Sequence, residues 1–255
     1  VCDVVPLIGL NRAIVSQGLR VMSSRKNLGL KTLIDVCKIE AKPAPYHLGY
    51  VLGPRINAGG RVGKCSHGAN LLINENPIES FKIATELNQY NKERQLIEKE
   101  LLKTVFKQAD LKINDPIIIL SGKDWHEGII GIIAARIKDK FDKPTIIISL
   151  NKGFGKASGR SIVGFDIGTA IISAVEEKIL TKGGGHKMAC GFSIEIEKIQ
   201  KFKEFMFKRF ISANTTNREN KLFYIDSKIS GSALNHNFYS KILKLSPFGS
   251  GNPEP

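Results

Sequence analysis

Residues 116–150 read PIIILSGKDWHEGIIGIIAARIKDKFDKPTIIISL, and this stretch decides the fold class. Its two ends, Pro116–Leu120 and Thr145–Leu150, are short apolar runs rich in isoleucine, which is typical of buried strands. The segment between them, Glu127–Phe141, has apolar residues at helical spacing and therefore predicts an amphipathic helix. The apolar face of this helix holds Ile130, Ile133, Ala134 and Ile137. A strand, a helix and a second strand in succession indicate an α/β fold.

The alternation of strands and helices continues toward the C-terminus. Phe154–Ser161 predicts an exposed strand with small side chains, and Asp166–Ile179 predicts a helix that its first residue caps. Phe192–Ile196 predicts a further strand and Lys198–Ile211 a further helix. Residues 113–214 therefore predict one α/β domain of about 100 residues, which is an ordinary domain size.

Residues 1–75 look like the tail of a larger α/β domain. Asn11 is placed to cap a first helix, and Leu30–Ile39 predicts a second helix with one apolar stripe. A loop is expected at Gly53–Gly63, because four glycines and two arginines within eleven residues are not ordinary linker composition.

One long helix is predicted from Pro77 to about Asp110. Pro77 suits the first turn of a helix, and at 1.5 Å per residue the helix would be about 50 Å long. Its middle, Asn88–Gln95, is polar between two apolar ends, which indicates a strut that joins two lobes. Residues 213–220 predict a polar linker, and the residues that follow are expected to begin a third unit.

The chain is strongly basic, with 38 Lys and Arg residues against 24 Asp and Glu residues and a formal charge of +14. Such an excess indicates a polyanionic partner such as nucleic acid. The many Ile, Lys and Asn residues also fit the coding bias of an AT-rich genome. Charge alone therefore leaves nucleic-acid binding open, and the position of specific arginines matters more.

The composition argues against several other classes of protein. Apolar residues make up 42% of the chain, which argues against disorder. No apolar run approaches the ~20 residues of a membrane span, and Val1–Leu7 lacks the basic flank of a signal peptide. The four cysteines show no paired spacing. They favour reduced thiols in a cytoplasmic protein over disulfides or a zinc site.

Gly53–Gly63 is the first candidate binding motif. Arg55 and Arg61 offer planar, bidentate donors to phosphate, and Asn57 adds a neutral donor. Glycines let backbone N–H groups approach an anion closely. A surface turn with incidental arginines is the alternative, and the segment alone does not decide between them.

The second motif is KGGGHK at residues 182–187, which is expected to connect a helix to a strand. Gly184 and Gly185 remove side-chain bulk, so that a phosphate or sugar can lie on the backbone. Imidazole groups in general change charge near neutral pH, so a histidine at position 186 can bind an anion or transfer a proton. A flexible turn with a chance histidine is the alternative.

Two further motifs are weaker. Ser158, Arg160 and Ser161 place two hydroxyls beside an arginine on a predicted strand, which suits a phosphate or sugar, although a polar strand end is the simpler reading. His126 stands at the start of a predicted helix, where the helix dipole favours anions. The neighbouring Trp125 is better explained as a core anchor.

Asp3 is the candidate metal ligand near the N-terminus. A catalytic divalent-metal site needs several carboxylate or histidine ligands. The chain has no D-x-D sequence and no adjacent Asp-His-His. Its sequence therefore does not supply a complete metal site.

Taken together and in this order, these segments resemble the RecJ branch of the DHH phosphoesterase superfamily. The resemblance rests on residues 1–7 (VCDVVPL), 53–63 (GPRINAGGRVG), 91–94 (NKER), 125–132 (WHEGIIGI), 158–161 (SGRS), 184–189 (GGHKMA) and 247–255 (PFGSGNPEP). Gly60 departs from the family pattern, in which alanine is commoner at this place. The resemblance covers essentially the whole chain.

The resemblance implies a domain order and a cofactor. It assigns residues 1–75 to the C-terminal part of a DHH phosphoesterase domain, 76–112 to a connecting helix, 113–214 to an α/β DHH-associated nucleic-acid-binding domain and 221–255 to the beginning of an OB-like domain. It implies two divalent metals, Mn²⁺ or Mg²⁺, that activate water for attack on a phosphodiester. Most of their ligands would lie in the preceding part of the first domain.

The resemblance also implies roles for individual residues. Asp3 would be a metal ligand, and Arg55 and His186 would contact the scissile phosphate as catalytic residues. The nucleic acid would be held by Arg55, Asn57, Arg61, His126, Ser158, Arg160, Ser161, Gly184, Gly185 and His186. The implied activity is 5′-to-3′ digestion of single-stranded DNA in repair and recombination, with single-strand-binding protein as a further partner.

Because most metal ligands are missing, we expect this chain alone to bind single-stranded DNA without cleaving it, with the N-terminal half as its missing partner. Two alternatives stay open. One is a non-catalytic module that binds single-stranded nucleic acid. The other is a DHH-family relative that acts on short RNA or cyclic dinucleotides, and Pro247–Pro255 argues against it because compact relatives lack this OB-like extension.

Overall fold

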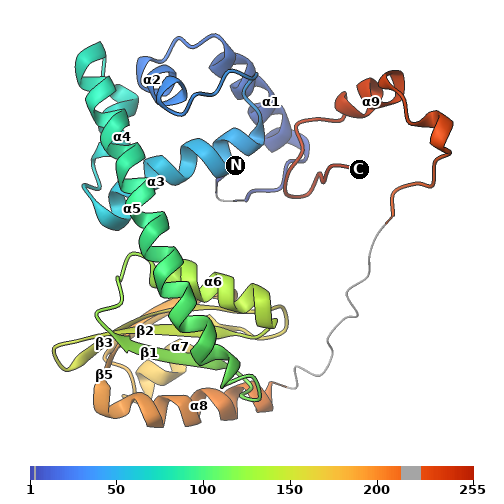
Figure 1. Ribbon diagram of the computed structural model, residues 1–255. Coiled ribbons are helices and arrows are strands. Elements are labelled where there is room, and N and C mark those ends of the chain that lie inside the picture. The colour runs from blue at the N-terminus through green and yellow to red at the C-terminus, as the bar shows by residue number, and fades with distance from the viewer. Residues whose placement is uncertain (3, 214–224) are drawn as a thin grey trace. The chain divides into compact units, whose positions relative to one another are not determined.

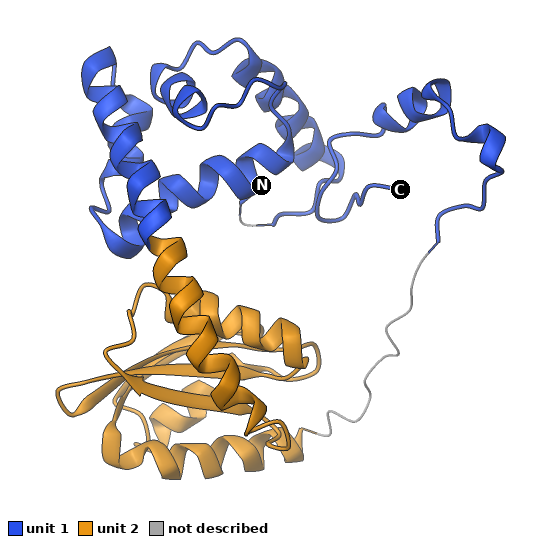
Figure 2. Cartoon of the chain, in the orientation of Figure 1, with its two compact units in different colours: residues 1–93, 221–255 blue, residues 94–220 orange. Residues whose placement is uncertain are grey.

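The computed structural model describes residues 1–2, 4–213 and 225–255 (Figure 1). The chain divides into two compact units: unit 1 comprises Val1–Glu93 with Lys221–Pro255, and unit 2 comprises Arg94–Asn220 (Figure 2). Asp3 and nearly all of the predicted polar linker lie outside the described residues. Among the helices of the described part, none is both long enough and apolar enough to cross a bilayer.

Unit 2 is built on a five-stranded sheet with the strand order β1-β2-β3-β5-β4. Strands β1 and β2 run parallel, and the other neighbouring pairs are antiparallel. The strands are β1 Ile118–Lys123, β2 Thr145–Asn151, β3 Phe154–Arg160, β4 Lys182–His186 and β5 Ala189–Glu195. The helices are α6 Ile130–Phe141, α7 Ile167–Glu176, the 3-10 turn η2 Ile196–Lys198 and α8 Ile199–Ser212. The predicted α/β fold is confirmed.

Helices pack on both faces of this sheet (Figure 1). One face meets α7 and α8 across an apolar core to which Ile146, Ile148, Phe192 and Phe202 contribute buried side chains. The opposite face meets α6, which packs over β2 and β3. Along β3 and β5, buried residues that face the core with α7 and α8 alternate with more exposed residues on the side of α6, because α6 leaves part of that side open.

Local signals set the ends of the helices in unit 2. The Asp166 carboxylate accepts a hydrogen bond from the Thr169 amide at 3.0 Å and caps α7 as predicted. Such a cap stabilises a helix by about 1 kcal/mol. Helix α6 ends where Asp142 adopts a left-handed conformation with φ of 52°.

Two details of unit 2 differ from the prediction. The glycine triplet is not a connection but is itself the edge strand β4. A Cβ atom on Gly183 would lie 2.8 Å from Cγ2 of Ile171, so the missing side chain lets α7 pack closely on the strand. Helix α6 begins at Ile130 rather than Glu127, because His126 first closes a turn in which its Nδ1 accepts from the Gly128 amide at 3.2 Å.

Helix α5 extends over Pro77–Asp110 and confirms the predicted long helix. Its start is fixed by Asn76, whose side-chain oxygen accepts from the amides of Ile78 at 2.9 Å and Glu79 at 3.1 Å. The residues up to Glu93 belong to unit 1 and the rest to unit 2.

An ion network ties α5 to α6 within unit 2. Glu98 is 8% exposed, and its carboxylate lies 2.5 Å from Nη1 of Arg94 and 3.3 Å from Nε of Arg136. The Nζ of Lys140 lies 4.3 Å from the ring centroid of Phe106. A buried carboxylate is tolerated here because two guanidinium groups compensate for its lost hydration.

Unit 1 contains a set of helices around its own apolar core. The helices are α1 Gly9–Ser23, α2 Leu28–Val36, the π-helix η1 His47–Leu52, α3 Gly53–Val62, α4 His67–Ile73, the first part of α5, the 3-10 turn η3 Gly231–Ala233 and α9 His236–Leu243. Its core is formed by Leu33, Ile34, Leu52, Leu71, Ile83, Ala84 and Leu87. The core therefore joins α2, η1, α4 and α5.

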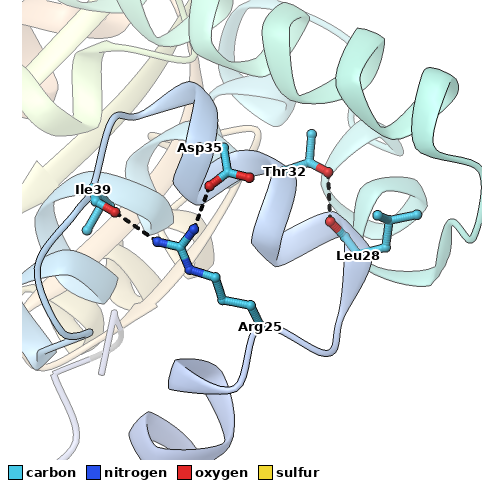
Figure 3. A network of polar contacts seen from close by, with 5 residues as sticks. All are labelled: Arg25, Leu28, Thr32, Asp35 and Ile39. Carbon is cyan, nitrogen blue, oxygen red and sulfur yellow. Dashed lines mark hydrogen bonds and ion pairs between the residues drawn. The ribbon is translucent and has the colours of Figure 1, made fainter.

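Arg25 connects the end of α1 to α2 (Figure 3). Its Nη1 lies 2.7 Å from the Asp35 carboxylate, and its Nη2 donates to the Ile39 carbonyl at 3.1 Å. Within α2 the Thr32 hydroxyl donates to the Leu28 carbonyl at 2.8 Å. One arginine side chain thus ties the turn after α1 to α2 and to the segment that follows it.

The loop predicted at Gly53–Gly63 is wrong, because Gly53–Val62 form the helix α3. Three of the segment's four glycines, all but Gly60, serve close packing instead of backbone flexibility. A Cβ atom on Gly63 would lie 2.5 Å from the Tyr90 ring, and one on Gly53 would overlap the Cys2 sulfur. Glycine clustering therefore marked tertiary contacts rather than a break in the helix.

The N-terminal segment of unit 1 contacts the C-terminal residues. The Leu7 amide donates to the Ser250 carbonyl at 2.6 Å. The predicted cap at Asn11 is wrong, because α1 already begins at Gly9. The Asn11 amide instead donates to the Pro6 carbonyl at 3.2 Å and holds the segment before the helix.

Candidate nucleic-acid interface

Beside α6, the sheet of unit 2 presents an open face formed by β3, β5 and β4. Residues that lie directly opposite in an antiparallel pair point to the same side of the sheet. The strand register therefore aligns three rows on this open face. They are Lys182, Ser193 and Lys156; Gly184, Gly191 and Ser158; and His186, Ala189 and Arg160. The intervening Ala157, Cys190 and Phe192 point to the other side and are buried.

Two glycines give the open face a flat floor. A Cβ atom on Gly184 would meet nothing within 4 Å, and one on Gly191 would meet only the Ala157 carbonyl at 3.7 Å. A ligand can therefore reach the backbone without displacing side chains. Gly185 differs from both, because its Cβ atom would point to the opposite side and lie 2.7 Å from Cα of Cys190.

Arg160 and Ser158 form one end of the face. The Arg160 Nη1 donates to the Ser158 hydroxyl at 3.2 Å and to the Gly159 carbonyl at 2.8 Å. A Cβ atom on Gly131, at the start of α6, would lie 3.2 Å from Arg160 Nη2. The small residue thus makes room for the guanidinium, which is a bidentate donor suited to phosphate.

A depression of about 530 Å³ extends from Ser158 and Gly191 toward two lysines, Lys156 and Lys182, which also line it. The Lys156 Nζ lies 2.6 Å from the Glu127 carboxylate, and both side chains are largely exposed. Such a pair is worth about 1 kcal/mol or less, so a phosphate can compete for the lysine. With Arg160 and His186, the face has four basic side chains around its floor and favours an anionic ligand.

The spacing of the basic groups suits an extended ligand rather than a single ion. Neighbouring strands lie about 4.8 Å apart, so the Cα atoms of Arg160 and His186 are separated by about 10 Å across β5. His186 and Lys182 are exposed at opposite ends of β4. The four basic side chains therefore surround the floor instead of converging on one point.

The structure separates two predicted contact residues, Ser161 and His126, from the open face. Ser161 is buried, and its hydroxyl donates to the Phe165 carbonyl at 2.7 Å, so a structural contact replaces the phosphate contact predicted for it. His126 is exposed but closes the turn before α6. The neighbouring Trp125 ring lies over Gly122 of β1. The Trp125 carbonyl accepts a hydrogen bond from the Ser149 hydroxyl at 2.5 Å.

Cys190 lies directly beneath the open face and is expected to be unreactive. Burial raises the pKa of its thiol to about 12, although a hydrogen bond from the Gly159 backbone and the nearby Arg160 charge both lower it. A neutral buried thiol is a poor nucleophile. Cys190 therefore contributes packing between β5 and the core.

In unit 1, the predicted residues Arg55, Asn57 and Arg61 all lie on α3. Arg55 is half-buried: its Nε donates to the Asn88 side chain at 2.9 Å and its Nη1 to the Val51 carbonyl at 2.7 Å. Asn57 and Arg61 are exposed. Each unit thus has its own set of candidate phosphate contacts, and Arg55 also holds α3 against α5.

The described residues do not fit a divalent-metal site. Within residues 1–2, 4–213 and 225–255, no three His, Cys, Asp or Glu side chains gather as metal ligands. The predicted ligand Asp3 lies outside the described residues. No metal-dependent step is therefore assigned to them.

Lys156 and Gly191 were not predicted as contacts from the sequence, and Lys182 was quoted only as the first residue of the KGGGHK motif. Their signal was weak, because a lysine or glycine at alternate strand positions is common on a solvent-facing sheet. The pairing of β5 between β3 and β4 is what brings them together. A register prediction for residues 182–195 against 154–160 would have found them.

Comparison with known proteins agrees with this geometry. Residues 114–212 match the DHHA1 domain, which covers the sheet and helices α6, α7 and α8. The chain is 30% identical over 261 residues to the single-stranded-DNA-specific exonuclease RecJ of Bacillus subtilis (strain 168), covering 100% of this chain. The chain is RecJ-like. The RecJ of Escherichia coli (strain K12) is 35% identical over 215 residues, which cover 80% of the RecJ-like chain.

A solved structure supports the same assignment. Crystal structures of Thermus thermophilus RecJ in complex with Mn²⁺ and with Mg²⁺ each match the RecJ-like chain with a TM-score of 0.85, at 28% identity and over 100% of its length. The chain spans 33% and 37% of the Bacillus and Escherichia proteins and 37% and 39% of the two Thermus chains. It therefore corresponds to about a third of these relatives.

Proposed function

We propose that this RecJ-like chain binds single-stranded DNA on the open face of its DHHA1 domain, as part of a 5′-to-3′ exonuclease. The observation that carries the proposal is the register that places Arg160, His186, Lys156 and Lys182 around the floor of Gly184 and Gly191. Phosphate contacts dominate the affinity of proteins for nucleic acid. The named activity of the Bacillus and Escherichia relatives supports DNA as the ligand.

Each kind of side chain on the open face would make a different contact with a DNA strand. Arg160 presents a planar fork to one phosphate, with the Ser158 hydroxyl beside it, and the lysines act as point charges. His186 offers a ring N–H at the far end of β4. The bare backbone at Gly184 lets a sugar or phosphate lie flat on the strand.

Arg55 and His186 remain our candidates for contact with the scissile phosphate in the complete enzyme. The half-buried position of Arg55, with its bonds to Asn88 and Val51, gives it a structural role as well. A variant at Arg55 therefore needs a stability measurement beside any activity measurement.

We further propose that this chain alone binds without hydrolysis, because its described residues contain no cluster of metal ligands. The remaining part of the catalytic domain would supply the Mn²⁺ or Mg²⁺ site and would be its obligatory partner. Incubation of the chain with a labelled oligonucleotide and MnCl₂ should release no mononucleotides. Sustained 5′-to-3′ digestion would overturn this part of the proposal.

Binding itself is tested by fluorescence anisotropy with a labelled single strand and the matching duplex. Lys156→Gln and Lys182→Gln should each weaken binding and lower the salt dependence by about 0.7 in the slope of log K against log salt, the value per phosphate on a single strand. Lys208→Gln removes the same charge from an exposed position on α8 and is the matched control. Equal effects of all three variants would contradict a localised site.

The cellular context follows from this function. We propose that the complete enzyme acts in DNA repair and recombination in the cytoplasm, with single-strand-binding protein as a partner. The free cysteines of the chain agree with a reducing compartment. A non-catalytic role in strand binding is the alternative. It would be favoured if the N-terminal part of the protein, supplied in trans, restored no nuclease activity.

A further inference from the structure

Two tyrosines stack on the surface of unit 1. The ring centroids of Tyr46 and Tyr50 lie 5.4 Å apart with an interplanar angle of 24°. Their side chains are 63% and 75% exposed. His47 meets Tyr46 edge-on, with centroids 5.8 Å apart and planes at 72°. Exposed aromatic rings offer flat faces on which a ligand with a flat face can stack.

The element beneath this pair is held firmly in place. The His47 Nδ1 accepts a hydrogen bond from the Ala44 amide at 3.0 Å, which closes the turn before η1. The Leu48 carbonyl accepts from the Cys2 thiol at 3.3 Å, and Leu52 is buried in the core of unit 1. Short π-helical turns occur frequently at functional sites. The rings therefore stand on a fixed support rather than on a free loop.

The same helix continues into α3, which presents polar groups on one side. Asn57 and Arg61 are four residues apart on α3 and therefore lie on one side of it. Both are exposed, as is Tyr50 on η1, which leads directly into α3. Arg61 follows Tyr50 by 11 residues, and at no more than about 1.5 Å per residue the two lie up to about 16 Å apart along the helix. This distance leaves room for more than one nucleotide.

We propose that Tyr46 and Tyr50 form a base-stacking platform for single-stranded DNA, with Asn57 and Arg61 as phosphate contacts further along the same helix. This inference rests on the proposed function and adds a second, base-dependent element to it. Aromatic rings bind any base through its π face, so the platform would hold a strand without reading its sequence. Duplex DNA would be excluded because its bases are already stacked.

The platform can be tested separately from the phosphate contacts. The probes are a labelled oligothymidylate and an abasic strand of the same length and charge, with anisotropy as the readout. Tyr50→Ala should weaken binding of the oligothymidylate about tenfold, the effect of losing about 1.4 kcal/mol of stacking. It should leave binding of the abasic strand unchanged, and Tyr50→Phe should retain most of the affinity because the ring remains.

Tyr239→Ala is the matched control, because Tyr239 is an exposed tyrosine of the same unit on α9. Circular dichroism verifies that each variant is folded. If Tyr50→Ala weakens both strands equally, or neither, or if Tyr239→Ala has the same effect, the platform is overturned while the DHHA1 site stands. If the wild-type chain binds neither strand at low salt, the proposed function itself fails and the platform fails with it.

Discussion

The glycines of β4 differ in what lies around them, and this difference predicts opposite effects of the same substitution. Gly184→Ala places a methyl group in open space on the proposed DNA-binding face. Gly185→Ala places it 2.7 Å from Cα of Cys190 and too close to the Ala189 carbonyl, on the side packed against α7. The first change should affect binding and the second should affect stability.

The expected magnitudes follow from these contacts. Overpacking a tight site costs about 1–3 kcal/mol, and the neighbours of Gly185 are backbone atoms that cannot move aside easily. A loss of about 2 kcal/mol lowers the Tm of a domain of about 100 residues by about 8–16 °C. Gly184→Ala should change the free energy of unfolding by about 0.5 kcal/mol or less, as for other surface substitutions.

Thermal unfolding and anisotropy on the same preparations separate the two effects. Gly184→Ala should keep the wild-type Tm and bind oligothymidylate more weakly. Gly185→Ala should unfold early but bind with near wild-type affinity well below its Tm. If Gly184→Ala lowers the Tm as much as Gly185→Ala, or leaves binding unchanged, the assignment of β4 to a binding face is refuted.

Three further predictions concern unit 2. Glu98→Ala should destabilise the chain by about 3–5 kcal/mol in chemical unfolding, because it removes the buried carboxylate that pairs with Arg94 and Arg136; a change under about 1 kcal/mol would show that the network is not buried in solution. Asp166→Ala should cost about 1 kcal/mol and Asp166→Asn much less, since asparagine also caps helices; equal losses would exclude a capping role. The pKa of Cys190 rises from 9.0 to about 12, so near neutral pH its thiolate fraction is lower by a factor of about a thousand. A thiol reagent should therefore modify exposed Cys65 first and Cys190 only after unfolding, and equal rates would contradict this burial.

Sequence patterns predicted the elements whose signals are local. Helix α5 was predicted at both ends, because Pro77 marks its start and its apolar residues recur at helical spacing. Strands β1 and β2 followed from short runs of isoleucine, and α7 from the cap at Asp166. These signals depend on neighbouring residues within one helical turn or one strand, so they can be recognised without knowledge of the fold.

The errors arose where distant contacts decide the structure. Gly53–Gly63 was predicted as a loop, but Gly53 is required by the approach of Cys2 and Gly63 by the approach of Tyr90. Only part of the open face could be predicted from the sequence, because Lys156 and Lys182 are brought to it by the non-local pairing of β3, β5 and β4. Tyr46 and Tyr50 were missed because nothing in the sequence indicates that two aromatic residues four apart remain exposed.

An NMR titration of the isotopically labelled chain with oligothymidylate tests the DHHA1 interface most directly. Amide shifts should concentrate on β3, β5 and β4, with Ser158, Gly184 and Gly191 among the largest, and should fade as salt is raised. Shifts confined to α7 and α8, or spread evenly over the exposed lysines, would contradict a DNA-binding site on the open face of this sheet.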